Sequence, residues 1–162
     1  MPLIKNGEEI ANDWMFVADG SALPDHTKVT VSLARFLAHQ AAQGNEPVPE
    51  GVRLSPEDDP AALEPYLAGL SLIEVAFPKY TDGRGYSQAQ LLRRRLGYSG
   101  ELRAVGHVLR DQIFYMHRSG FDAYETARAT VSQVLEALAE FTAAYQPAAS
   151  GPAAVFRKRH GA

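Results

Sequence analysis

Apolar and polar residues alternate along this chain with two different periods, and each change of period marks the border of a predicted element. Leu72–Phe77 and Leu102–Val105 are short, nearly continuous apolar runs, as expected of strands that are covered on both faces. Each run is followed by apolar residues at intervals of three and four, the spacing of a helix that packs along one side. The stretch Leu72–Tyr124 therefore predicts two successive strand–helix units, around which the rest of the chain is organised.

The same alternation extends to both sides of this stretch. Strand starts near residues 52, 72, 102 and 121 predict three to four βα units, and repeats of this length join parallel strands through right-handed crossovers. Residues 121–124 form either a last short strand or a turn. Pro65 predicts a kink or a short helix in the first unit, because a proline inside a helix removes a backbone hydrogen bond. Asp59 is expected to cap the first predicted helix. The following helices are predicted to begin at residues 87, 108 and 126, and Pro147 stops the last one.

The N-terminal part carries strand signals before any of these units. Asn6-Gly7 stands between Leu3–Lys5 and Glu8–Ile10 and predicts a β-hairpin, because both central residues tolerate a positive φ angle. Two more strands are expected at residues 14–17 and 29–31, followed by a helix that Ser32 caps. The breaker-rich stretch 44–49 then separates this part from the repeats.

The fold class that follows is α/β, with a mainly parallel open sheet extended by the N-terminal hairpin and strands. A half-barrel arrangement of the same units is the alternative. A chain of 162 residues is large enough for one core. We therefore predict a single domain over residues 1–146, with an N-terminal subregion 1–50 and a βα-repeat core 51–146, and a flexible basic tail over 147–162.

Composition excludes several functional classes. No run approaches the roughly 18 apolar residues of a membrane helix, and the N-terminus lacks the pattern of a secretory signal, so a cytoplasmic location is expected. The chain has no cysteine, which excludes disulfides, a thiol nucleophile and thiolate-held iron–sulfur clusters. Its five histidines contain no close pair of metal-ligand spacing. A zinc or iron site is therefore not expected, which leaves only weak magnesium binding by carboxylates open. No P-loop or dinucleotide-binding fingerprint is present, so no cofactor is expected.

Charge is distributed unevenly along the chain. Residues 1–78 contain 4 Lys/Arg and 12 Asp/Glu, whereas residues 79–128 contain 9 and 5. A basic middle within an acidic chain indicates an anionic ligand or an acidic partner, unless these arginines only decorate solvated helix faces. Arg93, Arg94 and Arg95 are consecutive on a predicted helix, so they point in different directions. Nucleic-acid binding is not favoured, because the chain is acidic overall.

Polar residues gather where the two central strands end. Ligands of α/β sheets and βα barrels bind beyond the carboxyl ends of the strands, so these segments are expected to share one edge. His107, at the entry of a helix, is the candidate for a catalytic base or hydrogen-bond donor, or else it only caps or packs. The candidates for binding an anion or a partner are Lys79, Asp82, Arg84, Tyr86, Arg110 and Asp111.

The glycines around these residues suit such a site. Asp82-Gly83-Arg84-Gly85 is predicted to be a loop whose backbone N–H groups, together with an arginine and a helix start near Ser87, favour an anion. The alternative is a turn that Asp82 closes by itself. Glu101 and Arg103 are charged residues within a predicted strand, and they indicate either an edge strand or a buried ion pair.

The segment FPKYTDGRGYSQAQLLRRRLGYSGELRAVGHVLRDQIFYMHRSGFDAY resembles the signature of a bacterial family catalogued as a domain of unknown function, number 934. Members of that family commonly carry an oxidoreductase label and are encoded beside assimilatory sulfite reductase. The resemblance therefore implies a role in sulfate assimilation, at the step from sulfite to sulfide, without supplying catalytic residues. This chain has His107 where many relatives have Asp, and Ser119 where many have Cys.

Three hypotheses follow, in this order. The first is an accessory protein that acts on sulfite reductase or its electron donor. The second is an enzyme, oxidoreductase or carrier for a small anion such as sulfite, sulfate or phosphate, with a site that combines Lys79, Arg84, His107 and Arg110. The third is a structural or interaction protein in which the same polar residues only fix the loops.

Overall fold

The computed structural model describes residues 2–24, 28–42, 48–140 and 149. The strands are β1 (Leu3–Lys5), β2 (Glu8–Ile10), β3 (Trp14–Phe16), β4 (Lys28–Ser32), β5 (Gly51–Leu54), β6 (Leu72–Phe77), β7 (Glu101–Gly106) and β8 (Ala123–Glu125). The helices are α1 (Leu33–Ala42), the 3₁₀ helix η1 (Pro60–Gly69), α2 (Arg84–Gln90), its π-helical continuation η2 (Leu91–Arg95), α3 (Arg110–Ser119) and α4 (Val131–Ala139).

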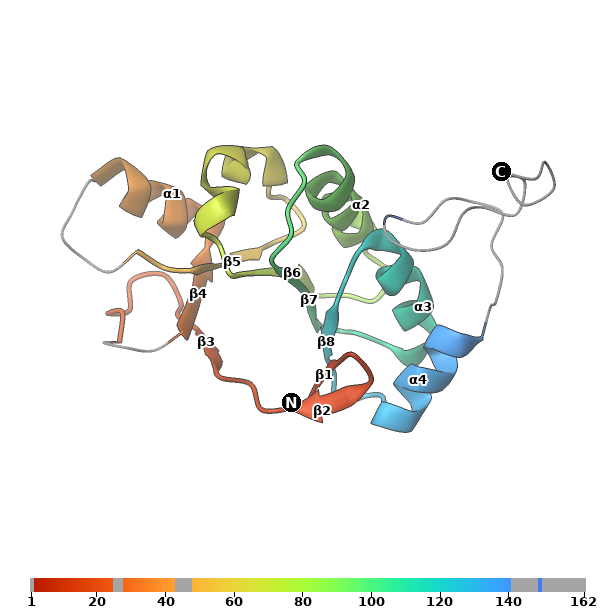
Figure 1. Ribbon diagram of the computed structural model, residues 1–162. Helices are drawn as coiled ribbons and strands as arrows, with labels where there is room; N and C mark the ends of the chain where they lie inside the picture. Colours follow the sequence, from red (N-terminus) through yellow and green to blue (C-terminus); the bar gives the residue numbers. More distant parts are fainter. Residues whose placement is uncertain (1, 25–27, 43–47, 141–148, 150–162) are drawn as a thin grey trace, which may run out of the picture.

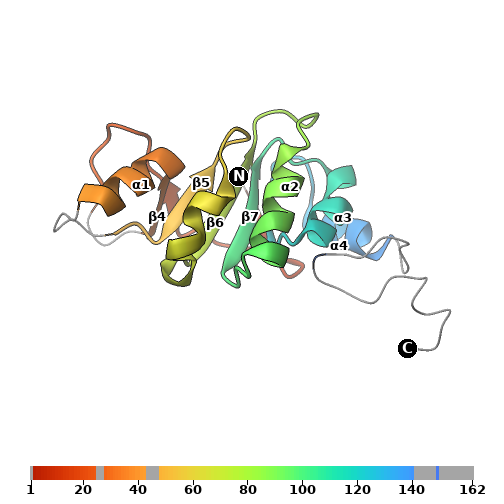
Figure 2. The ribbon, with the colours of Figure 1, turned by 90° about the horizontal axis from the view of Figure 1, so that it is seen from above.

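All of these strands belong to one eight-stranded sheet in the order β2-β1-β8-β7-β6-β5-β4-β3. Neighbouring strands from β3 to β8 run parallel, and the hairpin adds β1 antiparallel to β8. The sheet curls around an inner face, and the helices lie along its outer side (Figure 1; Figure 2 shows the helices in front of the strands). The fold is mixed α/β, and of the two predicted arrangements the half-barrel is the one observed.

The N-terminal hairpin forms as its sequence predicts. Asn6 and Gly7 both adopt positive φ angles, 53° and 80°, and β1 pairs with β2 on either side of them. The hairpin then joins the far end of the sheet, where Leu3 lies opposite Glu125. The first and last described strands of the chain are therefore neighbours.

The hydrophobic core lies between the sheet and the helices. Alternate residues of the central strands point outward to the helices, among them Val75 and Phe77, and both are fully buried. Gly85 of α2 packs directly on them: a Cβ atom at this position would lie 2.5 Å from Cζ of Phe77 and 3.0 Å from Cγ1 of Val75. The glycine lets the helix approach the sheet closely.

Several helix boundaries differ from the predicted ones. Helix α2 begins at Arg84, three residues before the predicted start, so Arg84 and Tyr86 belong to a helix and not to a loop. Helix α3 begins at Arg110 instead of 108. The segment with Pro65 forms a 3₁₀ helix, capped by Asp59 as expected. Of the two alternatives for residues 121–124, the strand is observed, as β8.

The last helix also starts later than predicted. Thr126 is fully buried, and its hydroxyl donates to the Val108 carbonyl, so it anchors a loop and does not start α4. Thr130 caps the helix instead, accepting from the Gln133 amide. Within α4, Val134 is buried but Leu135 is 48% exposed. The predicted continuation from residue 141, and the tail except Ala149, lie outside the described residues. Within the described ranges, no helix is both long and apolar enough to cross a membrane.

Candidate functional site

The two polar segments that the sequence singled out lie side by side. Because β6 and β7 are adjacent and parallel, Phe77 stands opposite Gly106 at their carboxyl ends. The His107 amide donates to the Phe77 carbonyl at 2.7 Å, and the Gln112 side chain donates to the Tyr80 carbonyl at 2.7 Å. The backbone therefore brings the segments 78–86 and 106–111 to one edge, as predicted.

Arg84 is already paired within the protein. Its guanidinium donates to both carboxylate oxygens of Asp82, at 3.0 and 2.7 Å, and to Glu57 at 3.1 Å. The Arg84 amide also donates to Asp82. These hydrogen bonds from Arg84, first from its side chain and then from its backbone, lower the pKa of Asp82 to about 2. The pKa of Arg84 is raised by the same contact. Two carboxylates thus compete with any external anion for this arginine.

The other predicted site residues do not complete a cluster around Arg84. Arg110 lies 3.2 Å from Glu140 at the end of α4 and 3.5 Å from Asp111. Tyr86 packs edge-on against Phe77 with ring centroids 5.5 Å apart, and burial raises the pKa of its hydroxyl. Lys79 and His107 are exposed. Among the described residues, no side-chain hydrogen bond or ion pair joins the set Lys79, Asp82, Arg84 and Tyr86 to the set His107, Arg110 and Asp111.

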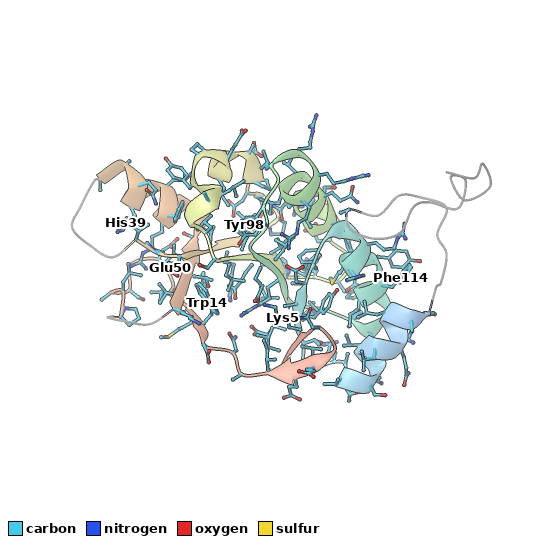
Figure 3. All side chains as sticks on the ribbon, viewed as in Figure 1. Lys5, Trp14, His39, Glu50, Tyr98 and Phe114 are labelled. Carbon is cyan, nitrogen blue, oxygen red and sulfur yellow. The ribbon has the colours of Figure 1, made fainter. Side chains whose placement is uncertain are left out.

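A second polar cluster occupies the inner face of the curled sheet. The strand register places Ser32 beside Arg53, Arg53 beside Glu74, and Glu74 beside Arg103, so these residues form one row across β4 to β7. Charges alternate along this row, as favourable cross-strand pairs require. Figure 3 shows Lys5, from the opposite end of the sheet, on the same inner side.

Hydrogen bonds satisfy the charges of this inner row. Glu74 accepts from Arg53 at 2.7 Å and from the Thr30 hydroxyl at 2.8 Å, and lies 3.7 Å from Arg103. Arg103 in turn donates to Glu101 at 2.7 Å. Asn12 lies in the segment that connects β2 to β3. Its side chain accepts a hydrogen bond from Arg103 and donates one to Glu125, and so it joins this segment to the row. The sequence left two alternatives for Glu101 and Arg103, an edge strand or a buried ion pair. The structure shows the ion pair.

Glu101 shows how the environment controls charge in this row. Burial alone would raise its pKa, but hydrogen bonds from Lys5 and Arg103 outweigh the burial and lower it. The carboxylate is therefore ionised together with its cationic neighbours. Sequence reasoning did not assign Arg53 and Glu74 to any site. Each of them is a charged residue within a predicted apolar strand, and this was the available signal. Their alignment in one row becomes visible only when the order and register of the strands are known.

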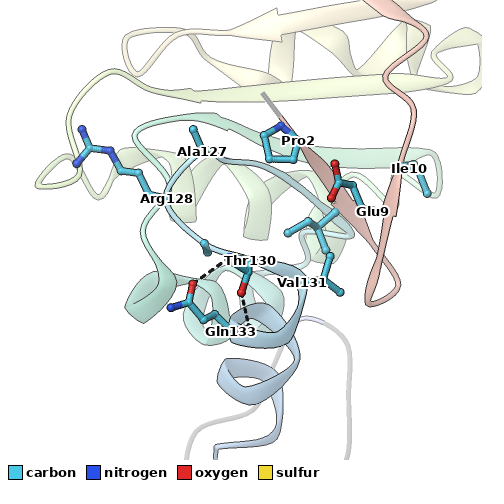
Figure 4. Close-up of a pocket in the computed structure, with 10 residues that line it drawn as sticks. Pro2, Glu9, Ile10, Ala127, Arg128, Thr130, Val131 and Gln133 are labelled. Carbon is cyan, nitrogen blue, oxygen red and sulfur yellow. Dashed lines mark hydrogen bonds between the residues drawn. The ribbon is translucent and has the colours of Figure 1, made fainter.

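Hollows in the surface lie elsewhere. A groove of about 710 Å³ opens beyond the carboxyl end of β8, between the N-terminal hairpin and the start of α4 (Figure 4). Ile4, Ile10 and Val131 give it an apolar lining, with Glu9 at its side. A second groove of about 480 Å³ follows the outer face of α2 and η2, and Arg94 and Arg95 line it together. Within the part of the chain that the structure describes, no group of three or more acidic or histidine side chains is arranged to hold a metal ion.

Comparison with known proteins yields one family. Residues 51–156, more than half of the chain, match a family described as "Bacterial protein of unknown function (DUF934)". No curated protein and no solved structure shows a significant match.

Proposed function

Because this chain belongs to the bacterial family DUF934, we propose that it is a cytoplasmic accessory protein of assimilatory sulfite reduction, which acts by contact with sulfite reductase or its electron donor. The proposal takes its pathway from the resemblance of residues 77–124 to that family's signature. It takes its mode of action, binding rather than catalysis, from the state of the arginines at the carboxyl edge.

The observation that carries the mode of action is the internal pairing of Arg84 and Arg110. Arg84 has two carboxylate partners, and Arg110 has Glu140 and Asp111. Two carboxylates already lie beside each of these arginines, so an anion that enters this edge meets competing negative charge at both. This pairing favours the edge as a surface for protein contact over the edge as a binding site for a small anion.

Unpaired cations lie on the outer surface instead. Arg94 and Arg95 form no ion pair with any described residue, and both line the groove along α2 and η2. The π-helical turn of η2 helps to place these neighbours on one groove, since a π-helix rotates less per residue than an α-helix. Two free guanidinium groups on an exposed helix suit an acidic protein surface.

Growth on defined sulfur sources tests the proposal. A strain that lacks the gene is expected to grow on sulfide and to fail, or to grow slowly, with sulfite as sole sulfur source. Complementation with the wild-type chain restores growth on sulfite. Equal growth of the deletion strain on both sources would remove the protein from the sulfite reductase step. A pull-down at low salt that recovers reductase or donor subunits identifies the contact.

A small-anion enzyme, oxidoreductase or carrier is the second candidate, and Lys79 and His107 favour it. Both side chains are exposed on adjacent loops, and neither forms a side-chain hydrogen bond or ion pair with a described residue. This candidate requires millimolar sulfite to raise the melting temperature, and Lys79→Ala to abolish the increase. A melting curve that sulfite leaves unchanged would count against it.

A further inference from the structure

The outward face of α2 and η2 forms one continuous strip of side chains. The groove of about 480 Å³ along this strip is lined at intervals of three and four residues, by Ser87, Gln90, Leu91, Arg94 and Arg95. Residues at these intervals lie on the same face of a helix, and this stretch extends over about 12 Å. Ala89 and Leu92, on the other side of the same helix, are fully buried in the core. The strip is therefore the side that another molecule can reach.

The strip carries positive charge that the protein leaves unpaired. From Gly83 to Gly100 the chain has four arginines and no acidic residue. Arg84 and Arg93 have carboxylate partners. Arg94 and Arg95 are exposed, and neither forms a side-chain hydrogen bond or an ion pair with a described residue. Two positive charges of the strip are thus left for an external carboxylate.

The last turn of η2 does not need Arg94 and Arg95 for its own hydrogen bonds. Arginines at the end of a helix can act by binding its last carbonyl groups and by complementing its dipole. Arg93 has this role, since its guanidinium donates to the carbonyls of Tyr98 and Gly100 at 2.6 and 2.9 Å. Arg94 and Arg95 belong to the same turn but donate to no carbonyl of a described residue. The capping of this helix end rests on Arg93, and the other two arginines remain available to a partner.

A helix fits this strip better than an extended segment does. The backbone groups of α2 and η2 are bonded within the helix, so an extended segment would find no edge with which to form a strand pair. A helix instead packs along the groove through its side chains. Leu91 is half-buried and offers an apolar contact in the middle of the strip, and Arg94 and Arg95 follow one turn later. Because a guanidinium pairs with a carboxylate through two parallel hydrogen bonds, glutamate or aspartate is expected opposite each arginine.

We propose that the outward face of α2 and η2 docks an acidic helix of a partner protein. The proposal rests on the proposed function only in that this partner belongs to the sulfite reductase system. The partner helix places an apolar side chain on Leu91. Two of its carboxylates, about one turn away on the same face, bind Arg94 and Arg95.

Two other occupants fit the strip less well. A second copy of this chain could offer Glu136 and Glu140 of its α4, which have the i, i+4 spacing, but Glu140 already lies 3.2 Å from Arg110. Nucleic acid is disfavoured by the formal net charge of −3, which repels a phosphate backbone.

Fluorescence anisotropy with the full-length protein tests the proposal. The probe is a labelled alanine-based peptide of about 20 residues, long enough to be helical, with one leucine at position i and glutamates at i+4 and i+7 on the same face. The control peptide has the same composition, but its glutamates stand at i+2 and i+5, on the opposite face. The first peptide is expected to bind at least tenfold more tightly than the control. Equal affinity of the two peptides, or no binding by either, would overturn the proposal.

A matched pair of double variants assigns the binding to the strip. Arg94→Gln/Arg95→Gln should weaken binding of the first peptide at least tenfold. Lys28→Gln/Arg128→Gln removes the same charge from two other exposed positions and should change the affinity less than twofold. Equal losses would show that only the net charge matters and would overturn the proposal.

Two further measurements test the other occupants. In sedimentation velocity, a dimer of the wild type that Arg94→Gln/Arg95→Gln dissociates would assign the strip to a second copy. A duplex oligonucleotide that competes with the peptide at lower concentration than unlabelled peptide does would assign it to nucleic acid. Either result would overturn the proposal.

Failure of this inference is distinguishable from failure of the proposed function. If the deletion strain fails on sulfite but Arg94→Gln/Arg95→Gln complements it fully, the pathway stands and the strip does not serve it. If the deletion strain grows equally on sulfite and sulfide while the double variant loses the peptide, the strip binds acidic helices and the pathway is wrong.

Discussion

Arg103 Nη1 lies 3.7 Å from Glu74 Oε1 at the centre of the curled sheet, and both side chains are only 2% exposed. Neither residue is the other's closest partner, since Glu74 is bound by Arg53 and Arg103 by Glu101. The contact thus joins two ion pairs into one row. Charges buried in this way cost desolvation energy, which only a complete set of partners offsets.

Replacing Arg103 by methionine should therefore destabilise the protein strongly. The change leaves Glu74 and Glu101 short of a cationic partner in a buried setting, and we expect the free energy of unfolding to fall by about 3–5 kcal/mol. Urea denaturation measures it. Arg94→Met is the matched control, because Arg94 is exposed and unpaired among described residues, and its effect should stay within about 0.5 kcal/mol. Similar values for both variants would show that the inner row does not stabilise the fold.

The two glycines that flank Arg84 should respond in opposite ways to alanine. Gly85→Ala places a methyl group 2.5 Å from the Phe77 ring, and overpacking of this kind costs about 1–3 kcal/mol. A methyl group at Gly83 would have no atom within 4 Å, and the φ angle there is −85°, so Gly83→Ala should be neutral or stabilise by up to about 1 kcal/mol. Thermal melts compare them. If Gly83→Ala also abolishes complementation on sulfite, a ligand or partner approaches the backbone there.

Arg93 should matter far more than its neighbours on the same helix. Its guanidinium donates to the carbonyls of Gly120, Tyr98 and Gly100 and pairs with Asp122. Arg93→Met leaves these acceptors without a donor, and hydrogen bonds from a charged group are worth about 1.5–3 kcal/mol each. We expect a loss above about 2 kcal/mol, against almost none for Arg95→Met. Urea denaturation of the three proteins measures the difference. Arg93→Lys should restore little, because an ammonium lacks the planar fork.

Glu101 makes the stability of the protein depend on pH. Its pKa is lower in the folded chain than its usual value of 4.5, so its contribution is complete above that pH and is lost as the pH falls. The difference in melting temperature between wild type and Glu101→Gln should be largest at about pH 7 and should shrink towards about pH 3. Calorimetry across this range measures it. If the difference in melting temperature stayed the same across this pH range, Lys5 and Arg103 would not bind the Glu101 carboxylate. The control is Glu64→Gln, at an exposed position.

Local signals predict the strands well and the helix starts less well. Leu72–Phe77 and the Asn6-Gly7 hairpin have the predicted bounds, because strand runs and turn residues act through neighbours in sequence. The glycines of the Asp82–Gly85 segment favour a loop when only the sequence is considered. In the structure Gly85 is inside α2, where close packing on Phe77 requires it. A glycine in a sequence does not by itself reveal whether it belongs to a loop or to a helix that packs closely on a neighbour.

The inner row could not be predicted because it depends on strand order. Arg53, Glu74 and Arg103 are each separated by at least about 20 residues, and they meet only through the register of three adjacent strands. The location of the carboxyl edge could be predicted, because adjacent parallel strands end on the same side of the sheet. Its internal ion pairs are not, because Glu57 and Glu140 come from segments that no local pattern joins to the edge.

The pairing of β1 with β8 also constrains the order of events during synthesis. Lys5 and Glu101 are 96 residues apart, and Asn12 and Glu125 are 113 apart, so the first strand leaves the ribosome long before its partners exist. Non-local pairings of this kind close late, after the entropy of a long loop has been lost. We expect β3 to β7 to assemble first and the hairpin to dock last. A nascent chain stalled before residue 123 would then carry an unpaired hairpin, and chaperones would meet the protein in that form.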